Sequence, residues 1–306
     1  MKQRTLTIAM FNQTFPNDDA CLDVLRDHIY PDGITCRSCK EIRPHHRLTQ
    51  RRAYSCDYCG THVYVLAGTI FAKTTTPLTS WFYAMFLMGS TRCGISAKQL
   101  ERELGVTYKT AWRMFNQIRK LLNEEPTMLS GEVELDEAYI GGKVRYSGSK
   151  SQMARARLRN KAVVAGQVQR GGRLQAFHPP HGTAGALVPL AQAHMLPGST
   201  VYTDELPAYK ALGRTGYYEH KRVHHAARIY VQGNAHVNTV EGFWSLLKNG
   251  IRGVYHSVSA KYLQSYVNEY VFRYNHRRDE MPMFGIIESQ VRHTRYGRYG
   301  RYAPID

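Results

Sequence analysis

Alternating polar and apolar residues predict a β-sheet in the middle of the chain. The run from Glu132 to Asp136 alternates at every position, which is typical of a strand with one buried face. Four later runs also have strand character, and Gly171-Gly172 between the first two of them suits a hairpin turn. These strands are expected at residues 161–169, 173–177, 199–203 and 217–224.

Helical spacing of apolar residues predicts that helices accompany this sheet. Apolar residues recur every three or four positions at 240–251 and again at 263–274, which lines one face of a helix in each segment. Helices are also expected at 184–195 and 207–212. The resulting order is strand-strand-strand-helix-strand-helix-strand-helix. It predicts an RNase H-like α/β domain with a mixed five-stranded sheet.

A helix-turn-helix is predicted upstream, in a helical region at about 77–125. Residues 96–104 form the first helix, Gly105 makes the turn, and Thr107 caps a second helix at 108–121. In this motif the second helix enters the major groove of DNA. The side chains expected to face DNA are Tyr108, Lys109, Thr110 and Arg113. The alternative is an ordinary helical hairpin that makes no DNA contact.

Four of the six cysteines form two Cys-x-x-Cys pairs, which are separated by residues 40–55. Thiolates are soft ligands, and zinc prefers four of them in a tetrahedron. We therefore expect a zinc ribbon with the ligands Cys36, Cys39, Cys56 and Cys59. A pair of redox motifs is the alternative, but such motifs accompany a βαβ unit, which this region does not predict. The nearby histidines are expected at the surface or facing DNA: His45, His46 and His62.

The charge of the chain indicates a polyanionic partner. Lys and Arg number 41 against 24 Asp and Glu, which gives a net charge of +17. Such an excess over a whole folded protein favours binding to nucleic acid. The sequence shows no apolar run that would span a membrane, no secretory signal and no basic amphipathic helix. A cytosolic DNA-binding protein is therefore expected.

Acidic residues are informative because they are scarce in this basic chain. From Ala138 to Thr203 there is no Asp or Glu, and Asp204 then follows the fourth strand directly. In an RNase H-like sheet the first and fourth strands are neighbours, so Asp136, at the predicted end of the first strand, should converge with Asp204. Glu241 lies on the polar face of a following helix.

Three converging carboxylates would form a hard oxygen site for Mg²⁺ or Mn²⁺. Two such ions about 4 Å apart support an in-line phosphodiester displacement. Lys248, two turns after the third acid, is placed to reach a DNA phosphate. Each aspartate alone is a weak signal, because Glu134 and Glu137 flank the first and Glu205 follows the second.

Three stretches of the chain resemble the ISXO2-like DDE transposases of the IS1595 group. They are VELDEAYIGGK at 133–143, YTDE at 202–205 and HVNTVEGFWSLLK at 236–248, and the run at 266–277 is similar too. The resemblance covers about residues 15–285, and EGFWSLLK is its most specific part. It implies a DDE site made of Asp136, Asp204 and Glu241, with Lys248 as an accessory residue. Some members carry Asn at the third acidic position, whereas this chain has Glu.

The resemblance also implies the activity and the partners. The protein is expected to bind the inverted-repeat ends of a bacterial insertion sequence, as double-stranded DNA, to cut them, and to join them to target DNA. Because both ends must be held together, at least a homodimer is expected. The cofactors implied are Mg²⁺ or Mn²⁺ at the active site and structural Zn²⁺. The expected location is the cytoplasm, associated with the nucleoid.

Four regions are therefore predicted along the chain. They are a zinc ribbon at 1–72, a helix-turn-helix region at 73–128, an RNase H-like catalytic domain at 129–285 and a tail at 286–306. The tail is rich in Arg, Tyr and Gly, so it is expected to be disordered.

Three alternative functions remain open at this point. A DNA-binding regulator derived from a transposase would not cleave DNA, although the intact acids argue against it. An RNase H-like nuclease would cleave DNA without joining it. A tyrosine nucleophile is conceivable because the chain has 21 tyrosines, but no Arg-His-Arg constellation accompanies one of them.

Overall fold

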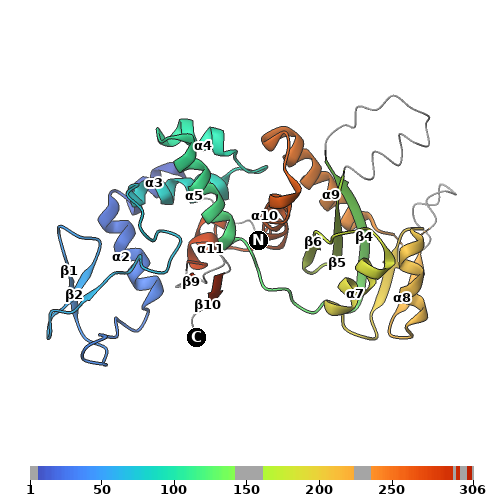
Figure 1. Cartoon of the computed structure of the whole chain (residues 1–306), viewed down its shortest axis with the longest axis horizontal. Coiled ribbons are helices and arrows are strands. Elements are labelled where there is room, and N and C mark those ends of the chain that lie inside the picture. Colours follow the sequence, from blue (N-terminus) through green and yellow to red (C-terminus); the bar gives the residue numbers. More distant parts are fainter. Residues whose placement is uncertain (1–5, 142–160, 224–235, 292–293, 297–301, 305–306) are drawn as a thin grey trace. The chain divides into compact units, whose positions relative to one another are not determined.

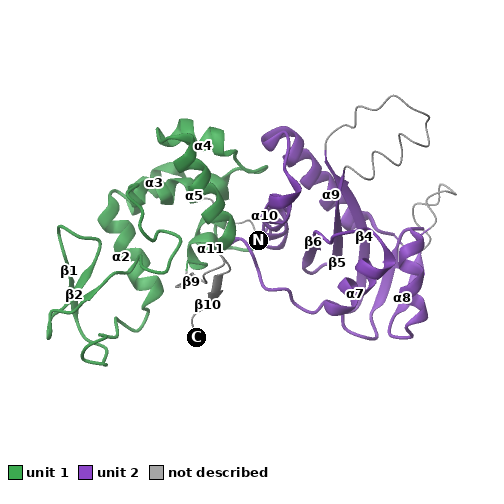
Figure 2. Ribbon diagram, in the orientation of Figure 1, with its two compact units in different colours: residues 1–121, 279–306 green, residues 122–278 purple. Residues whose placement is uncertain are grey.

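The computed structural model describes residues 6–141, 161–223, 236–291, 294–296 and 302–304. Gly142 and Lys143 of the first motif and His224 of the fifth predicted strand lie outside these ranges. The chain divides into two compact units (Figure 2), residues 1–121 with 279–306 and residues 122–278. Among the described residues, no helix is both long enough and apolar enough to cross a membrane.

The second unit is built on a sheet with the strand order β6-β5-β4-β7-β8 (Figure 1). Its strands are β4 (Glu132–Ile140), β5 (Ala162–Gln169), β6 (Leu174–Phe177), β7 (Thr200–Thr203) and β8 (Glu219–Arg222). Strand β5 runs antiparallel to both of its neighbours, and the other adjacent pairs are parallel. This strand order with one antiparallel strand is that of the RNase H-like fold, so the predicted fold class is confirmed.

The register of β4 places the first aspartate differently from the prediction. Leu135 pairs with Thr203, the last residue of β7, so Asp136 and Asp204 follow at neighbouring positions. The predicted strand ended at Asp136, whereas β4 continues to Ile140 because its antiparallel pairing with β5 continues that far. Asp136 therefore lies inside a strand, at the level where the parallel neighbour ends.

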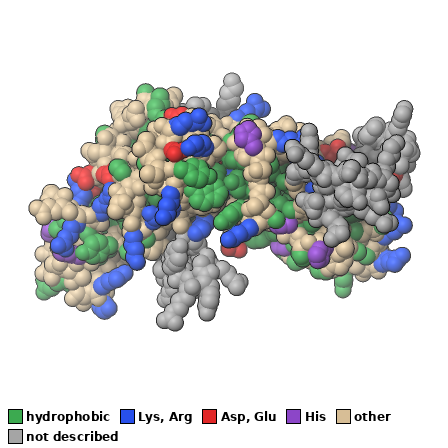
Figure 3. Space-filling model, turned by 45° about the horizontal axis from the view of Figure 1, so that its top comes forward, with side chains coloured by type: hydrophobic (Ala, Val, Ile, Leu, Met, Phe, Trp, Pro, Cys, Tyr) green, Lys and Arg blue, Asp and Glu red, His purple; other side chains and the backbone are tan. Residues whose placement is uncertain are grey.

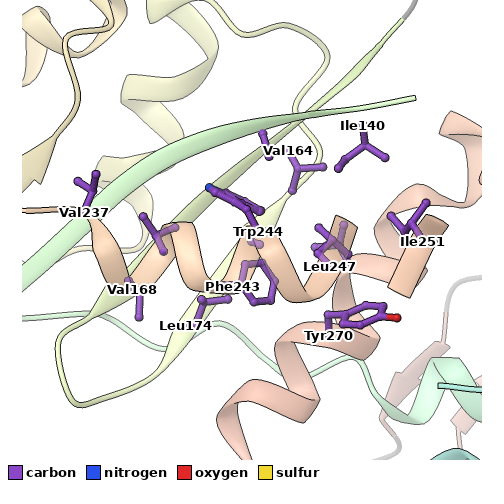
Figure 4. Packing of buried hydrophobic residues seen from close by; sticks show 14 of the residues in the cluster. Ile140, Val164, Val168, Leu174, Val237, Phe243, Trp244, Leu247, Ile251 and Tyr270 are labelled. Atoms are coloured by element: carbon purple, nitrogen blue, oxygen red, sulfur yellow. The ribbon is translucent and has the colours of Figure 1, made fainter. Parts of the chain in front are cut away.

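Two apolar layers cover the faces of this sheet. The first layer contains α9 (Asn238–Gly250), its π-helical continuation η3 (Ile251–Tyr255) and α10 (Ala260–Asn275). The second layer, on the opposite face, contains α7 (Ala184–Ala193), η1 (Pro207–Tyr209) and α8 (Lys210–Arg214). Side chains of β4 alternate between the layers, so Ala138 packs toward α9 while Leu135 packs on the opposite face. Figure 4 shows Phe243, Trp244 and Leu247 of α9 in the first layer.

The first unit contains a small antiparallel sheet and a set of helices. The sheet consists of β1 (His45–Arg47), β2 (Tyr54–Cys56) and β3 (His62–Val63). The helices are α1 (Ile8–Thr14), α2 (Asp18–Ile29), α3 (Leu78–Ser90), α4 (Ala97–Leu104), α5 (Tyr108–Leu121) and α11 (Met283–Ser289). Helix α1 was not predicted from the sequence.

The C-terminal segment also differs from the expectation. Helix α11 packs on α3, and its Phe284 ring contacts the rings of Phe11, Phe15 and Phe82. The boundary predicted at residue 285 therefore falls inside a helix that belongs to the core of the first unit. Within the predicted tail, β9 (Thr294–Tyr296) pairs with β10 (Tyr302–Pro304). Residues 292–293, 297–301 and 305–306 lie outside the described ranges.

Candidate active site and zinc centre

A group of three carboxylates lies where β7 ends. One oxygen atom from each of Asp136, Glu137 and Asp204 lies within 4.8 Å of the other two. Strand β4 supplies the first two residues, and the turn after β7 supplies the third. In that turn, Asp204 Oδ1 accepts a hydrogen bond from the backbone N–H of Leu206 at 2.9 Å. The structure thus brings together two of the three predicted acids and adds Glu137, which the sequence offered only as a neighbour.

Glu241, the third predicted acid, stands apart from this group. It lies in the first turn of α9, and its side chain is exposed. Its charge contributes to raising the pKa of Asp136, so the two carboxylates interact. Lys248 is half-buried near the other end of the same helix. The roles of Glu241 as a metal ligand and of Lys248 as a phosphate contact stay predictions.

Burial and mutual repulsion both act on the grouped acids. Burial, together with the charges of Asp204 and Glu241, raises the pKa of Asp136 to about 6. Burial, together with the charges of Asp136 and Asp204, raises the pKa of Glu137 to about 7. Hard oxygen donors crowded in this way suit a divalent cation such as Mg²⁺ or Mn²⁺, which would neutralise the repulsion. The residues present therefore fit the implied metal.

Trp244 on α9 holds Asp136 in position. Its indole Nε1–H donates a hydrogen bond to Asp136 Oδ2 at 2.8 Å. The indole also lies against β5 at Gly166, which pairs with Asp136 in the sheet. A Cβ atom on Gly166 would come within 2.6 Å of the Trp244 ring, so this close approach requires glycine. The helical periodicity predicted Trp244 as a core residue, but no sequence signal indicated its hydrogen bond.

Glu134 on β4 caps the helix that carries Glu241. It is fully buried and accepts hydrogen bonds from the backbone N–H groups of Thr239 at 2.9 Å and Val240 at 3.1 Å. The Thr239 hydroxyl and Arg170 Nε donate to its other oxygen at 3.0 and 2.9 Å. Helix α9 has no capping side chain at its own N-cap position, so a carboxylate from the sheet satisfies its first-turn donors. Glu134 thus fixes where α9 begins and therefore where Glu241 lies.

The four paired cysteines meet at one place in the first unit. Their Sγ atoms all lie within 4.8 Å of one another. A hydrogen bond from the Cys39 backbone N–H lowers the pKa of Cys36, and hydrogen bonding with Thr61 lowers the pKa of Cys59 to about 6. Thiolates so arranged fit a tetrahedral zinc site. The predicted zinc ribbon is confirmed as a fold with its four cysteines clustered.

The nearby histidines are not part of the cysteine cluster. His45 Nδ1 hydrogen-bonds with the Arg43 carbonyl oxygen at 2.7 Å, and His46 Nδ1 lies 2.5 Å from a carboxylate oxygen of Asp57. His62 is exposed. His46 is exposed as well, as expected, whereas His45 is half-buried, and contact of these histidines with DNA stays a prediction.

The two helices α4 and α5 lie where the sequence predicted them. Ser96 Oγ accepts a hydrogen bond from the backbone N–H of Gln99 at 3.1 Å and so caps α4. Gly105 adopts a φ of +62° in the turn, a left-handed conformation that glycine favours. Thr107 Oγ1 then accepts from the backbone N–H of Thr110 at 3.4 Å, at the start of α5.

The side chains predicted to face DNA lie at the N-terminal end of α5. Tyr108, Lys109 and Arg113 are exposed, and Thr110 is half-buried. Arg113 also donates a hydrogen bond to the Ala72 carbonyl oxygen at 3.0 Å, so it is partly engaged within its own chain. Contact of these residues with DNA stays a prediction.

The chain is similar to proteins of transposable elements. Residues 128–275 match the model of the ISXO2-like transposase domain, and residues 16–62 match that of the transposase zinc-ribbon domain. A protein of Halobacterium salinarum, described as an uncharacterized protein in transposable element ISH50, is 29% identical over 279 residues. That alignment covers 85% of this chain and 94% of the relative.

Two solved structures show a weak likeness to the chain, each at 12% sequence identity. A chain of the simian T-cell lymphotropic virus intasome in complex with PP2A regulatory subunit B56 gamma gives a TM-score of 0.31, covering 69% of this chain and 74% of that one. A pre-cleavage Mos1 transpososome gives a TM-score of 0.26, covering 68% and 75%. The strand order described above, and not these scores, identifies the fold.

Proposed function

Because the chain belongs to the ISXO2-like transposase family of the IS1595 group, we propose that it cuts the ends of an insertion sequence and joins them to target DNA. The observation that carries this proposal is the carboxylate group at the end of β7 in an RNase H-like sheet. The net charge of +17 supports a DNA substrate.

Asp136, Asp204 and Glu241 are the residues proposed to hold two divalent ions, Mg²⁺ or Mn²⁺. When bound, such ions activate the attacking oxygen and stabilise the leaving oxygen of an in-line displacement. Trp244 orients Asp136 through its indole N–H, and Glu134 sets the start of the helix that carries Glu241. These two contacts keep the proposed ligands in place before DNA binds.

Two displacements at phosphorus are proposed to share this site. In the first, a water oxygen bonds to phosphorus at the element's end and the P–O3′ bond breaks, so the element keeps a free 3′-OH. In the second, that 3′-OH attacks a phosphodiester of the target and displaces a target 3′ oxygen. Both are in-line substitutions, so neither needs a covalent bond between DNA and the protein. Lys248 is proposed to contact a phosphate of the bound DNA.

The first unit is proposed to recognise the ends of the element. The exposed Tyr108 and Lys109 at the start of α5 are suited to approach the major groove. Lys and Arg side chains are exposed on the face drawn in Figure 3, in keeping with contacts to phosphates. Because two ends are joined in one reaction, the working assembly is proposed to be at least a dimer.

Incubation of the full-length protein with Mg²⁺ and candidate inverted-repeat DNA, followed by sequencing of the products, tests this proposal. Cleavage at the element's end and joined products are expected from the wild type. Asp136→Ala, Asp204→Ala and Glu241→Ala should each abolish both while leaving DNA binding measurable, and Glu219→Ala, an exposed acid on β8, serves as the control. Full activity in one of the three variants removes that residue from the site.

A pre-cut DNA end separates the rival functions, because it bypasses the first displacement. Cleavage of intact ends without joining of pre-cut ends would indicate a nuclease. DNA binding with neither reaction would indicate a regulator.

A further inference from the structure

Glu137 is a carboxylate of the candidate active site that the predicted triad does not contain. We infer that it is a further ligand of the divalent ion held between Asp136 and Asp204. The inference rests on the proposed function, because it takes the carboxylate group to be a site for Mg²⁺ or Mn²⁺. It assigns that ion three carboxylates, two from β4 and one from the turn after β7, in addition to Glu241 on the helix.

The end of β7 explains how Glu137 reaches this group. Successive residues of β4 start on opposite faces of the sheet, so Glu137 begins on the face of Leu135 and Asp136 on the other. Pairing of β4 with β7 stops at Leu135 and Thr203. Beyond that pair, no described strand lies along the edge of β4 that faces β7. Side chains from both faces of β4 can therefore meet beside Asp204. One oxygen atom from each of Asp136, Glu137 and Asp204 lies within 4.8 Å of the other two.

The two oxygen atoms of Glu137 have different surroundings. A hydrogen bond with the buried Tyr209 of η1 orients the carboxylate. Oε2, by contrast, is buried and has no hydrogen-bond partner among the described residues. Leaving a buried acceptor without a donor is unfavourable. One oxygen atom of the same carboxylate also lies within 4.8 Å of an oxygen atom of Asp136 and of Asp204. A cation is the partner that satisfies the Glu137 carboxylate and its two acidic neighbours together.

Glu134, on the same strand, shows what a structural carboxylate looks like in this sheet. Both of its oxygens accept hydrogen bonds from protein donors, two of them backbone N–H groups of α9 and one the Arg170 guanidinium. No Lys or Arg forms an ion pair with Glu137 within the described part of the chain. Its neighbours of like charge, Asp136 and Asp204, add to its electrostatic cost. Glu137 therefore has the surroundings of a metal ligand and lacks those of a structural acid.

Mn²⁺ binding to the full-length, zinc-loaded protein tests this inference without relying on catalysis. Free Mn²⁺ is measured by its electron paramagnetic resonance signal as the ion is titrated into each variant. Glu137→Gln, which keeps the shape of the side chain and an oxygen that can accept from Tyr209, should weaken binding of one ion at least tenfold. Glu219→Gln removes the same charge from the exposed surface of β8 and should leave binding unchanged.

Glu137→Asp separates ligation from a general effect of charge. It keeps the negative charge but withdraws the carboxylate by one methylene group, so a ligand role predicts weaker Mn²⁺ binding for this variant too. It also decides the matter if Glu137→Gln fails to fold, as checked by circular dichroism. Wild-type affinity in whichever of these variants fold overturns the inference.

The Asp136→Asn and Asp204→Asn variants distinguish this failure from failure of the proposed function. If both lose Mn²⁺ and the Glu137 variants keep it, only the role of Glu137 is wrong. If the wild type itself binds no Mn²⁺, the metal-dependent function is wrong as well.

Discussion

The two candidate metal centres of this chain are built in opposite ways. The cysteine cluster belongs to a ribbon whose strands are two or three residues long, and of its four ligands only Cys56 lies within one of those strands. The carboxylate group belongs to a five-stranded sheet with an apolar layer on each face. This contrast teaches that zinc should be required for folding, whereas the ion of the second unit should be required for the reaction only.

Loss of zinc should have the largest effect. Cys56→Ser, or chelation of the wild type, should unfold residues 30–65, because zinc binding by such small sites is worth about 10 kcal/mol or more. Hydrogen exchange followed by mass spectrometry should show lost protection in the ribbon and preserved protection in β4, β5 and β7. Cys93→Ser, at an exposed cysteine outside the cluster, is the matched control. If hydrogen exchange in the ribbon is unchanged after verified removal of zinc, zinc is not required for its folding.

Glu134→Ala should be the most damaging single change in the second unit. It removes the cap of α9 and leaves the Arg170 guanidinium without its buried partner, which costs about 3–5 kcal/mol. The free energy of unfolding from urea titration measures this loss. Glu219→Ala, at an exposed acid of the same sheet, should change it by less than about 0.5 kcal/mol. A loss no larger than that of the control would show that α9 does not depend on Glu134.

Gly166→Ala should have an intermediate effect on stability. The new methyl group meets the Trp244 ring, so it should destabilise the unit by about 1–3 kcal/mol and displace the indole from Asp136. The free energy of unfolding from urea titration and the rate of DNA cleavage should both fall. Gly242→Ala, on α9 where a Cβ meets nothing within 4 Å, should leave stability unchanged or raise it. Equal behaviour of the two alanine variants would contradict the packing of Trp244.

Asp136→Asn should stabilise the metal-free protein at alkaline pH. Burial raises the pKa of Asp136 from 3.8 to about 6, so between these values the folded state binds more protons than the unfolded state. The free energy of unfolding of the wild type therefore falls as the pH rises through this window. The variant lacks the titrating carboxyl group, so it does not show this loss. Its advantage above pH 7 should be on the order of 1 kcal/mol.

Urea unfolding from pH 4 to pH 8 without metal measures the difference between wild type and Asp136→Asn. Addition of Mg²⁺ should reverse the order at pH 8, because only the wild type gains a full set of ligands. A variant that is less stable than the wild type at pH 8 without metal would contradict the electrostatic account of the site.

Lys109→Ala should have the smallest effect, on DNA binding and not on folding. Loss of one phosphate contact should weaken binding to all sequences alike and make the dependence of log affinity on log salt shallower by about 1. Fluorescence anisotropy with labelled DNA at several salt concentrations measures both quantities. Lys120→Ala, at the other end of α5 and also exposed, is the control. Equal salt dependence in both variants would argue against a DNA contact by Lys109.

Much of the fold could be predicted because its signals are local. Alternation along β4 and helical spacing along α9 and α10 reflect which face of each element is buried. The convergence of Asp136 with Asp204 followed from the strand order of the RNase H-like fold. Helices α1 and α11 could not be predicted, because each is seven residues long and gains stability from contacts with distant residues, such as the contact between Phe11 and Phe284.

The details of the candidate active site could not be predicted, because they depend on where other elements begin and end. Side chains alternate along a strand, so the sequence places Glu134 and Asp136 on one face of β4 and Glu137 on the opposite face. It does not reveal that Glu134 caps the first turn of α9, or that β7 stops where Glu137 can turn toward Asp204. The fit of Trp244 against Gly166 joins residues far apart in the sequence and has no local signal.

Anomalous diffraction from crystals of the full-length protein soaked in Mn²⁺ shows which ion each of the two centres holds. Data collected near the manganese and zinc absorption edges assign each ion to its centre. We expect manganese between Asp136, Glu137 and Asp204 and zinc among the four cysteines. Zinc at the cysteines with no manganese at the carboxylates, under soaking that preserves the fold, would contradict this expectation.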